Sequence, residues 1–315
     1  MKYTAGVDIG GTNTKIGIVN EKGELLVKKE IKTLSYNGVE KTLIRIWKMI
    51  EELLFLLDID KKDLKGIGMG IPGPVINKKI VGFFANFPWE KNLNISKIFE
   101  TISGKVTKVE NDVNVIALGE TKFGAGKGSK ISVTIALGTG IGGGIYINGK
   151  ILSGINGAGG EIGHIKLVKD GKLCGCGQKG CFEAYASATG LEREAISRLK
   201  VNRTNKLYQK LNGKIDELEA KDIFDCAKDG DIFSLDIVEY EAEYLAMGMG
   251  NILNIINPEK IILCGGVSLA GELLLNKVKE KLPKYALNIT LKNFNIVLGN
   301  LGNDAGIKGA AALID

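Results

Sequence analysis

Hydrophobic and polar positions follow two periods along this chain. Runs with alternating or continuous β-branched residues predict strands, and apolar positions three to four residues apart predict amphipathic helices. The strands are predicted at 2–8, 14–19, 24–31, 65–71, 106–110, 131–137, 144–147 and 260–264. The helices are predicted at 39–57, 96–103, 113–123, 191–200, 220–228, 232–256, 270–282 and 305–313. This alternation of strands and helices predicts an α/β protein.

The chain contains an internal repetition. A strand, a glycine-rich turn and a second strand open the chain at 2–19, and the same pattern returns at 131–147. Each turn follows a buried strand, and neither opens directly into a helix. We therefore interpret the chain as two similarly built halves, and we disfavour both the Rossmann and the Walker type of phosphate loop, which do open into a helix.

Composition and charge narrow the class of protein. The chain has 315 residues, of which 44% are hydrophobic and 25% charged, as in an ordinary globular protein of one or two domains. The formal charge of +6 is spread along the chain, so nucleic-acid binding is not expected. Glycines interrupt the uncharged stretch 131–149, and asparagines interrupt 244–258, so neither predicts a membrane span. The first residues lack an apolar secretory core, which favours a reducing, cytoplasmic location.

A cysteine-rich loop is the most specific chemical signal. Cys174, Cys176 and Cys181 lie among glycines, and His164, the single histidine, precedes them. Three thiolates and one imidazole form a complete tetrahedral zinc set. Disulfides are an alternative, but the chain has five cysteines, an odd number. A histidine that is merely part of the core is the other alternative; the spacing favours a zinc ligand.

The two glycine turns are candidate phosphate-binding loops. Glycines let successive backbone N–H groups close on phosphate oxygens, and a threonine hydroxyl adds a donor. The residues concerned are Gly10, Gly11, Thr12, Gly138, Thr139 and Gly140. A third pair, Gly265 and Gly266, follows the last predicted strand and would permit close approach of a ligand, although a plain turn is the alternative.

Three motifs resemble the signatures of the ROK family of repressors and sugar kinases. They are Asp8-Ile-Gly-Gly-Thr-Asn-Thr-Lys15, Gly159-Gly-Glu-Ile-Gly-His164 and Cys174-Gly-Cys-Gly-Gln-Lys-Gly-Cys-Phe-Glu183. The resemblance covers nearly the whole chain and is greatest with the bacterial ATP-dependent glucokinases. It implies the actin-like (ribonuclease H-like) duplicated ATPase fold, with two domains and an interdomain cleft. The expected domains are a small one at 1–111, onto which helix 304–315 packs back, and a large one at 112–303 that carries the zinc loop.

The resemblance also implies a reaction, the ATP-dependent phosphorylation of the 6-hydroxyl of a hexose, with glucose as the expected substrate. Asp112 would accept the proton of that hydroxyl, and Asn111 would bind the sugar. From the sequence alone, a helix N-cap is an equal alternative for Asp112. Asp8 is expected to meet Mg²⁺–ATP, with the end of a buried strand as its alternative role, and Lys15 to reach phosphate. Gly265 and Gly266 would approach the adenosine.

Sugar recognition is the second implication of the resemblance. It places Glu161, Glu183 and His164 on the sugar, together with Asn86 of the segment Asn86-Phe-Pro-Trp89, for which an exposed tryptophan clamp is the alternative. A metal ion on one imidazole nitrogen would fix the tautomer of His164 and leave the other N–H as an oriented donor. Zinc is thus expected to support the sugar site without activating water.

Two alternatives stay open at this stage. The first is a kinase of the same family for an N-acetylhexosamine, mannose or fructose, because such enzymes share these motifs. The second is a sugar-sensing regulator without catalysis. The presence of Asp112 and of both glycine turns argues against it, and the turn at Asp8 leaves no room for a preceding DNA-binding domain. A homodimer or homotetramer is expected from the resemblance.

Overall fold

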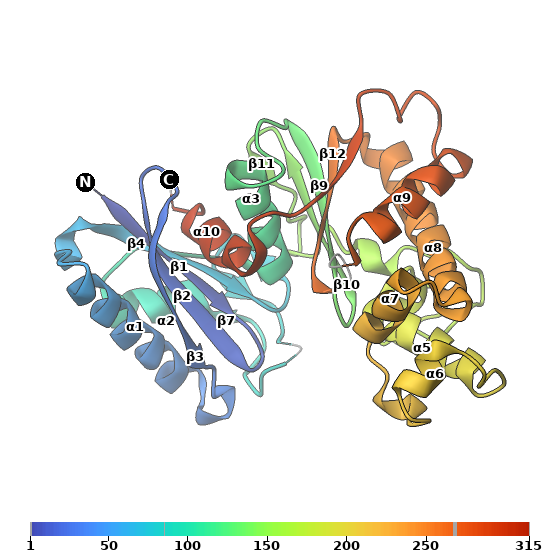
Figure 1. The fold of residues 1–315 in the computed structure, drawn as a ribbon. Coiled ribbons are helices and arrows are strands. Elements are labelled where there is room, and N and C mark those ends of the chain that lie inside the picture. The colour runs from blue at the N-terminus through green and yellow to red at the C-terminus, as the bar shows by residue number, and fades with distance from the viewer. Residues whose placement is uncertain (1, 85, 267–269, 315) are drawn as a thin grey trace. The chain divides into compact units, whose positions relative to one another are not determined.

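The structure is a computed structural model that describes residues 2–84, 86–266 and 270–314 (Figure 1). The chain divides into two compact units. The first unit consists of Met1–Thr134, Gly144–Gly160 and Gly299–Asp315. The second unit consists of Ile135–Gly143 and Glu161–Leu298. The α/β class predicted from the alternating strands and helices is confirmed, whereas the predicted domain boundary at residue 111 stays a prediction.

The first unit is built on a five-stranded sheet with the order β3-β2-β1-β4-β8. Its strands are β1 (Tyr3–Ile9), β2 (Asn13–Asn20), β3 (Leu25–Lys32), β4 (Leu64–Ile71) and β8 (Thr107–Asn111). Strands β1, β2 and β3 pair antiparallel, and β4 and β8 join β1 in parallel. The central strands are almost continuously buried, because helices cover both faces of the sheet.

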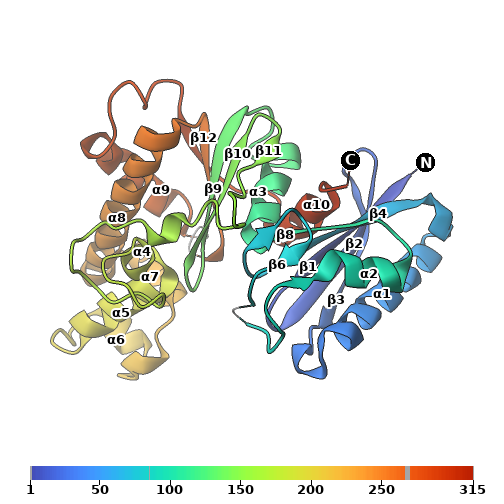
Figure 2. The same ribbon diagram turned by 180° about the vertical axis from the view of Figure 1, so that it is seen from behind.

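Helices on opposite faces close this core (Figures 1 and 2). One face carries α1 (Val39–Leu56) and α2 (Ile95–Ser103), and the other carries α10 (Ala305–Ala311), which packs against α3 (Asp112–Phe123). Glycines in the sheet admit α10 at very short range. A Cβ at Gly6 would lie 2.0 Å from the Ile307 carbonyl oxygen, and one at Gly68 would lie 1.7 Å from that of Ala310. Larger residues at these positions would push α10 off the sheet.

A small antiparallel sheet follows β4 and was not predicted from the sequence. Its strands are β5 (Val75–Ile76), β6 (Ile80–Val81) and β7 (Leu93–Asn94). Each strand is only two residues long, too short to produce a periodic pattern. Val75 and Val81 are nevertheless completely buried and belong to the main hydrophobic core of the first unit.

A second five-stranded sheet has the order β11-β10-β9-β12-β13. Its strands are β9 (Ile131–Leu137), β10 (Ile141–Ile147), β11 (Lys150–Ile151), β12 (Lys260–Cys264) and β13 (Asn295–Leu298). The division between the two units runs through β9 and β10. Strands β12 and β13 pair in parallel, as the strands of an α/β sheet do.

The helices of the second unit pack mainly on one another. They are α4 (Glu183–Ala186), α5 (Ala188–Leu199), α6 (Lys206–Lys210), α7 (Ala220–Lys228), α8 (Ile232–Ile256) and α9 (Glu272–Lys281). The long helix α8 contacts α4, α5, α7 and α9. Short 3₁₀ helices occupy the connections, at Ser35–Asn37, Lys61–Asp63, Ile162–His164, Ile215–Glu217, Leu282–Lys284 and Gly302–Asp304.

The predicted elements lie within three residues of their observed bounds. Helix α5 begins three residues earlier than predicted, because the Ser187 side chain accepts the Gly190 N–H and caps the helix there. Strands β11 and β13 and helices α4 and α6 were not predicted. Within the part of the chain that the structure describes, no helix has the length and apolar character needed to cross a bilayer.

Candidate functional site

The first glycine turn is held in one shape by hydrogen bonds. The Gly10 N–H donates to the Asn13 carbonyl at 3.0 Å, and the Thr33 hydroxyl donates to the Gly10 carbonyl at 2.7 Å. The Thr33 N–H donates to the Thr12 carbonyl at 2.9 Å, which fixes the other end of the turn. A Cβ added at Gly11 would lie 3.7 Å from that of Asn86, so the structure places the predicted sugar residue beside the predicted phosphate loop.

Asp8 lies next to this turn at the end of β1, partly shielded from solvent. Its register partner on β2 is Lys15, whose Nζ donates to Asn303 Oδ1 at 3.1 Å. A Cβ at Gly306, in α10, would lie 2.4 Å from Asp8 Oδ2, so a glycine is needed there for the carboxylate to fit. Burial, and to a lesser extent the charge of Asp112, raise the pKa of Asp8 to about 6, and Lys15 opposes this rise. Two carboxylates therefore share one electrostatic environment.

Asp112 is the first residue of α3, and the residue before it provides the cap. The Asn111 side-chain oxygen accepts the Val113 and Asn114 N–H groups at 2.9 and 3.2 Å, and its Nδ2 donates to the Gly73 carbonyl at 3.2 Å. The capping alternative for Asp112 is therefore wrong. Burial raises the pKa of Asp112, whereas the Val113 N–H, 3.0 Å from Oδ1, lowers it. The predicted sugar-binding role of Asn111 stays a prediction, because its amide oxygen serves the cap and its amide nitrogen donates to Gly73.

The aromatic segment that contains Asn86 is packed and does not form an exposed clamp. The Trp89 ring lies 4.7 Å from that of Phe87 and 5.2 Å from that of Phe84, and its indole N–H donates to the Ser35 carbonyl at 2.8 Å. Asn86 itself is exposed. The rings thus anchor the loop and leave its asparagine accessible.

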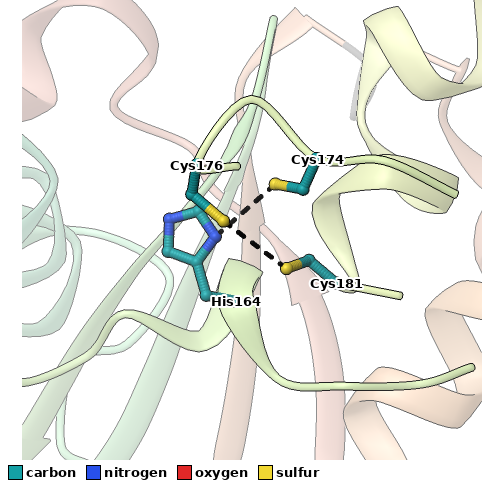
Figure 3. Close-up of side chains that lie close together, drawn as sticks. All are labelled: His164, Cys174, Cys176 and Cys181. Carbon is teal, nitrogen blue, oxygen red and sulfur yellow. Dashed lines mark hydrogen bonds between the residues drawn. The ribbon is translucent and has the colours of Figure 1, made fainter. Parts of the chain in front are cut away.

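In the second unit, the three thiols and the imidazole predicted as zinc ligands converge (Figure 3). Their candidate ligand atoms all lie within 4.8 Å of one another. Cys176 Sγ is 3.7 Å from Cys181 Sγ, and Cys174 Sγ is 3.8 Å from His164 Nδ1. Tetrahedral zinc with bonds of ~2.3 Å separates its sulfur ligands by about 3.8 Å, so the donor set and spacing fit such an ion.

The loop reaches this shape through glycines and a tight hairpin. Gly177 and Gly180 have φ values of +84° and +78°, which other residues rarely adopt. The Cys174 N–H donates to the Gln178 carbonyl at 2.8 Å and closes the turn. Burial raises the pKa of Cys174 to about 12, whereas the Gln178 N–H lowers that of Cys176. Metal binding requires thiolates, so metal affinity in this loop depends on pH.

The other nitrogen of His164 faces away from the sulfurs. Its Nε2 lies 3.9 Å from Glu161 Oε2, and both side chains are partly exposed. Glu183 is placed differently: one oxygen accepts the Ile141 N–H at 2.9 Å, and the other accepts from Cys174 Sγ at 3.4 Å. The structure therefore brings Glu161 together with His164, while Glu183 links the cysteine loop to the second glycine turn.

A cavity of about 500 Å³ adjoins that second turn. Gly138 and Thr139 line it together with Gly266, so one residue pair of the second turn and a glycine that is far away in sequence meet at one hollow. The remaining lining residues are Ala188, Glu192, Glu219, Ala220, Lys221, Phe224, Asp225, Lys228 and Ala270. Sequence reasoning missed this contribution of α7, because its pattern is that of an ordinary amphipathic helix. The volume suits a nucleoside-sized ligand.

Comparison with known proteins identifies the family of this chain. The sequence matches the ROK family over residues 4–315. It is 38% identical to the glucokinase of Thermotoga maritima over 310 residues, which covers 98% of this chain and 96% of that protein. It is also 38% identical to the glucokinase of Halalkalibacterium halodurans over 315 residues, 99% of this chain and 95% of that protein.

Solved structures of relatives have the same fold. A ROK family glucokinase from Streptomyces griseus, in complex with glucose and AMPPNP, superposes with a TM-score of 0.80 at 34% identity and 99% coverage of both chains. The ROK hexokinase from Thermus thermophilus gives a TM-score of 0.83 at 29% identity, covering 98% of this chain and 96% of its own. The predicted actin-like ATPase fold with two domains is confirmed. The chain belongs to the ROK family.

Proposed function

We propose that this protein is an ATP-dependent hexose kinase that converts glucose to glucose 6-phosphate. The curated relatives that are 34–38% identical over nearly the whole chain include glucokinases from Thermotoga maritima, Halalkalibacterium halodurans and Streptomyces coelicolor. The related Streptomyces griseus enzyme is complexed with glucose and a nucleotide analogue. The function is therefore that of a phosphotransferase with ATP as donor and a hexose as acceptor.

One observation in this chain carries the chemical part of the proposal. Asp112 begins α3 without capping it, and its charge raises the pKa of Asp8 beside the first glycine turn. A carboxylate that is not the helix cap, near a candidate phosphate loop, is what transfer to an alcohol needs. Its own raised pKa makes it a better proton acceptor than an ordinary aspartate.

The reaction then proceeds with the following assignments. Asp112 accepts the proton of the sugar 6-hydroxyl as that oxygen bonds to the γ-phosphorus. The bond between the γ-phosphorus and the bridging oxygen breaks, and ADP leaves with the electron pair. Backbone N–H groups and hydroxyls of the two turns, at Gly10–Thr12 and Gly138–Gly140, stabilise the phosphate charge. Mg²⁺ would supply counter-charge to the phosphates, with Asp8 as its partner in this chain.

We assign sugar recognition to Asn86, Glu161 and His164, with Asn111 and Glu183 as further predicted contacts. Zinc would be held by the Nδ1 atom of His164 and by the three thiolates, and would stabilise the loop. With Nδ1 committed to the ion, Nε2 must carry the proton and can donate to a hydroxyl or to Glu161. The separation of 3.9 Å between Nε2 and Glu161 leaves both groups able to share one ligand oxygen.

We assign the nucleoside to the cavity beside Gly138, Thr139 and Gly266. Gly266 has open space where its side chain would be, so a ligand can approach its backbone closely. Phe224 provides an apolar wall, and charged side chains of both signs, such as Lys221 and Glu219, can donate to or accept from the polar edges of a nucleoside.

A coupled assay of ADP release across a panel of sugars tests the proposal. Glucose is expected to give the highest kcat/KM, with Asp112→Asn as a matched inactive control. Preference for N-acetylglucosamine would instead assign the chain to the activity of relatives such as the Vibrio cholerae N-acetyl-D-glucosamine kinase, which is 31% identical. No turnover with any sugar, despite measurable sugar binding, would favour a regulator. Light scattering on the same preparation checks the predicted homodimer or homotetramer.

A further inference from the structure

We propose that Glu110 is a positioning residue. Its single buried carboxylate holds the predicted base Asp112 and the loop at Ser153 in a fixed position relative to each other. This inference rests on the proposed function, because it concerns the geometry of that reaction. Glu110 is only 1% exposed and lies in strand β8, directly before Asn111, which ends the strand and caps α3. A buried carboxylate at such a place is costly unless its hydrogen bonds are satisfied.

One oxygen of Glu110 serves the start of α3. Its Oε1 accepts the Asn111 N–H at 2.9 Å and the Asn114 Nδ2 at 3.1 Å. Asn111 in turn caps the helix, and Asp112 follows at its first position. The direction of the first turn of α3, and with it the direction of the Asp112 side chain, therefore depends on this carboxylate.

The other oxygen holds a loop that is far away in sequence. Glu110 Oε2 accepts from the Ser153 hydroxyl at 2.8 Å. The loop is pinched at its base, because the Gly159 N–H donates to the Ser153 carbonyl at 2.8 Å. It also packs on β5, where a Cβ at Gly157 would lie 2.3 Å from the Val75 carbonyl oxygen.

The chain after this loop carries residues that we assign to the sugar. The pinch ends at Gly159, and Glu161 and His164, which we assign to the sugar, follow within a few residues. Moving the base of the loop would therefore move the chain directly before Glu161 and His164. A single carboxylate thus contacts both the cap that precedes Asp112 and the loop whose chain continues to Glu161 and His164.

Glu120, at the other end of α3, offers a matched comparison. It is also 1% exposed, and it accepts backbone N–H groups of Ala125, Asn300 and Leu301 at 3.0, 3.3 and 2.9 Å. None of these partners belongs to the predicted sugar site. Glu120 and Glu110 are thus equally buried carboxylates with several hydrogen bonds each, and only Glu110 contacts segments that carry the assigned chemistry.

The experiment compares Ser153→Ala, Glu110→Ala, Glu110→Gln and the control Glu120→Gln in the zinc-loaded full chain. We measure KM for glucose, KM for ATP, kcat, the glucose Kd by calorimetry without ATP, and the melting temperature. Ser153→Ala is expected to raise both KM and Kd for glucose about tenfold, the size of one lost hydrogen bond to a charged group, with KM for ATP unchanged. Glu110→Ala is expected to lower kcat as well.

Two further results separate positioning from general stability. Glu110→Gln can still accept at one atom and donate to the Ser153 hydroxyl from the other, so it is expected to restore glucose affinity to within about threefold of wild type. Because Ser153→Ala and Glu110→Ala remove the same hydrogen bond, the double variant is expected to raise KM for glucose no further than Glu110→Ala alone. Glu120→Gln is expected to lower the melting temperature without changing the ratio of the two KM values.

Several outcomes would overturn the inference. One is additive effects of the two alanine substitutions on glucose affinity. Another is a Ser153→Ala protein with wild-type glucose KM and Kd, a result that is decisive even if Glu110→Ala fails to fold. A third is an equal rise in both KM values for Glu110→Ala and Glu120→Gln. If all variants lack kinase activity on every sugar while calorimetry still gives the predicted pattern of glucose Kd values, the proposed reaction fails and the positioning role stands.

Discussion

Replacing Asp8 with asparagine should stabilise the protein when no ligand is bound and should impair it as an enzyme. Asp8 lies against Gly306 of α10, near the like charge of Asp112, with Lys15 as its compensating cation. Asparagine has nearly the same shape and no charge. The substitution therefore removes the cost of holding a carboxylate in this place, and also removes the residue that we assign to Mg²⁺–ATP.

The magnitude follows from the pKa of Asp8. Burial and the Asp112 charge, opposed by Lys15, raise it from 3.8 to about 6. Each pKa unit corresponds to about 1.36 kcal/mol, so the full cost is about 3 kcal/mol. Because the side chain is only partly shielded from solvent, we expect asparagine to gain ~1–3 kcal/mol at pH 7. The raised pKa means that the folded state binds the extra proton. The cost is therefore full above pH 6 and disappears as the pH falls towards 3.8.

Urea unfolding of wild type and Asp8→Asn between pH 4 and pH 7.5, without nucleotide or Mg²⁺, measures this difference. The advantage of Asp8→Asn should shrink as the pH falls, and Mg²⁺–ATP should stabilise the wild type more than the variant. Asp216→Asn, at an exposed aspartate, serves as the control and should show no such trend. A destabilised Asp8→Asn protein, or an advantage that does not change with pH, would refute the reasoning.

Three further predictions concern the assigned groups. Asp112→Asn should lower kcat about 10²- to 10⁴-fold without lowering the melting temperature, because burial raises the pKa of Asp112, and full activity would exclude it as the base. Cys176→Ala, or chelation followed by metal analysis, should lower melting temperature and glucose affinity together; zinc-free protein with normal affinity would contradict this. Gly266→Ala should raise KM for ATP without lowering the melting temperature. Gly265→Ala, at φ +90° with its Cβ 2.3 Å from the Leu137 carbonyl oxygen, should lower the melting temperature.

Local chemistry made much of the candidate site predictable. The cysteine loop is predictable because its thiols lie close together in sequence. Glycines such as Gly177 and Gly180 give the backbone the freedom that brings these thiols together. The glycine turns are predictable for the same reason, because their residues are close together in sequence. Their neighbours follow from strand register: Asp8 and Lys15 are opposite each other once the hairpin between β1 and β2 is assigned.

Contacts between distant segments could not be predicted in this way. Glu110 and Ser153 meet only because β8 and the loop after β11 pack in one unit, and no periodicity in the sequence predicts that contact. The same holds for Phe224, whose helix looks ordinary until it lines the cavity beside Gly138. The capping alternative for Asp112 was open because aspartate and asparagine are equally good caps; only the observed bonds of Asn111 decide it.

The central claim is that phosphate passes from ATP to the 6-hydroxyl of glucose. Phosphorus NMR of the product mixture, with ADP quantified in the same sample, tests it most directly. We predict one glucose 6-phosphate for each ADP formed, and neither product with Asp112→Asn. Formation of ADP together with free phosphate instead of a sugar phosphate would contradict the account. So would a phosphoryl group on any other hydroxyl of the sugar.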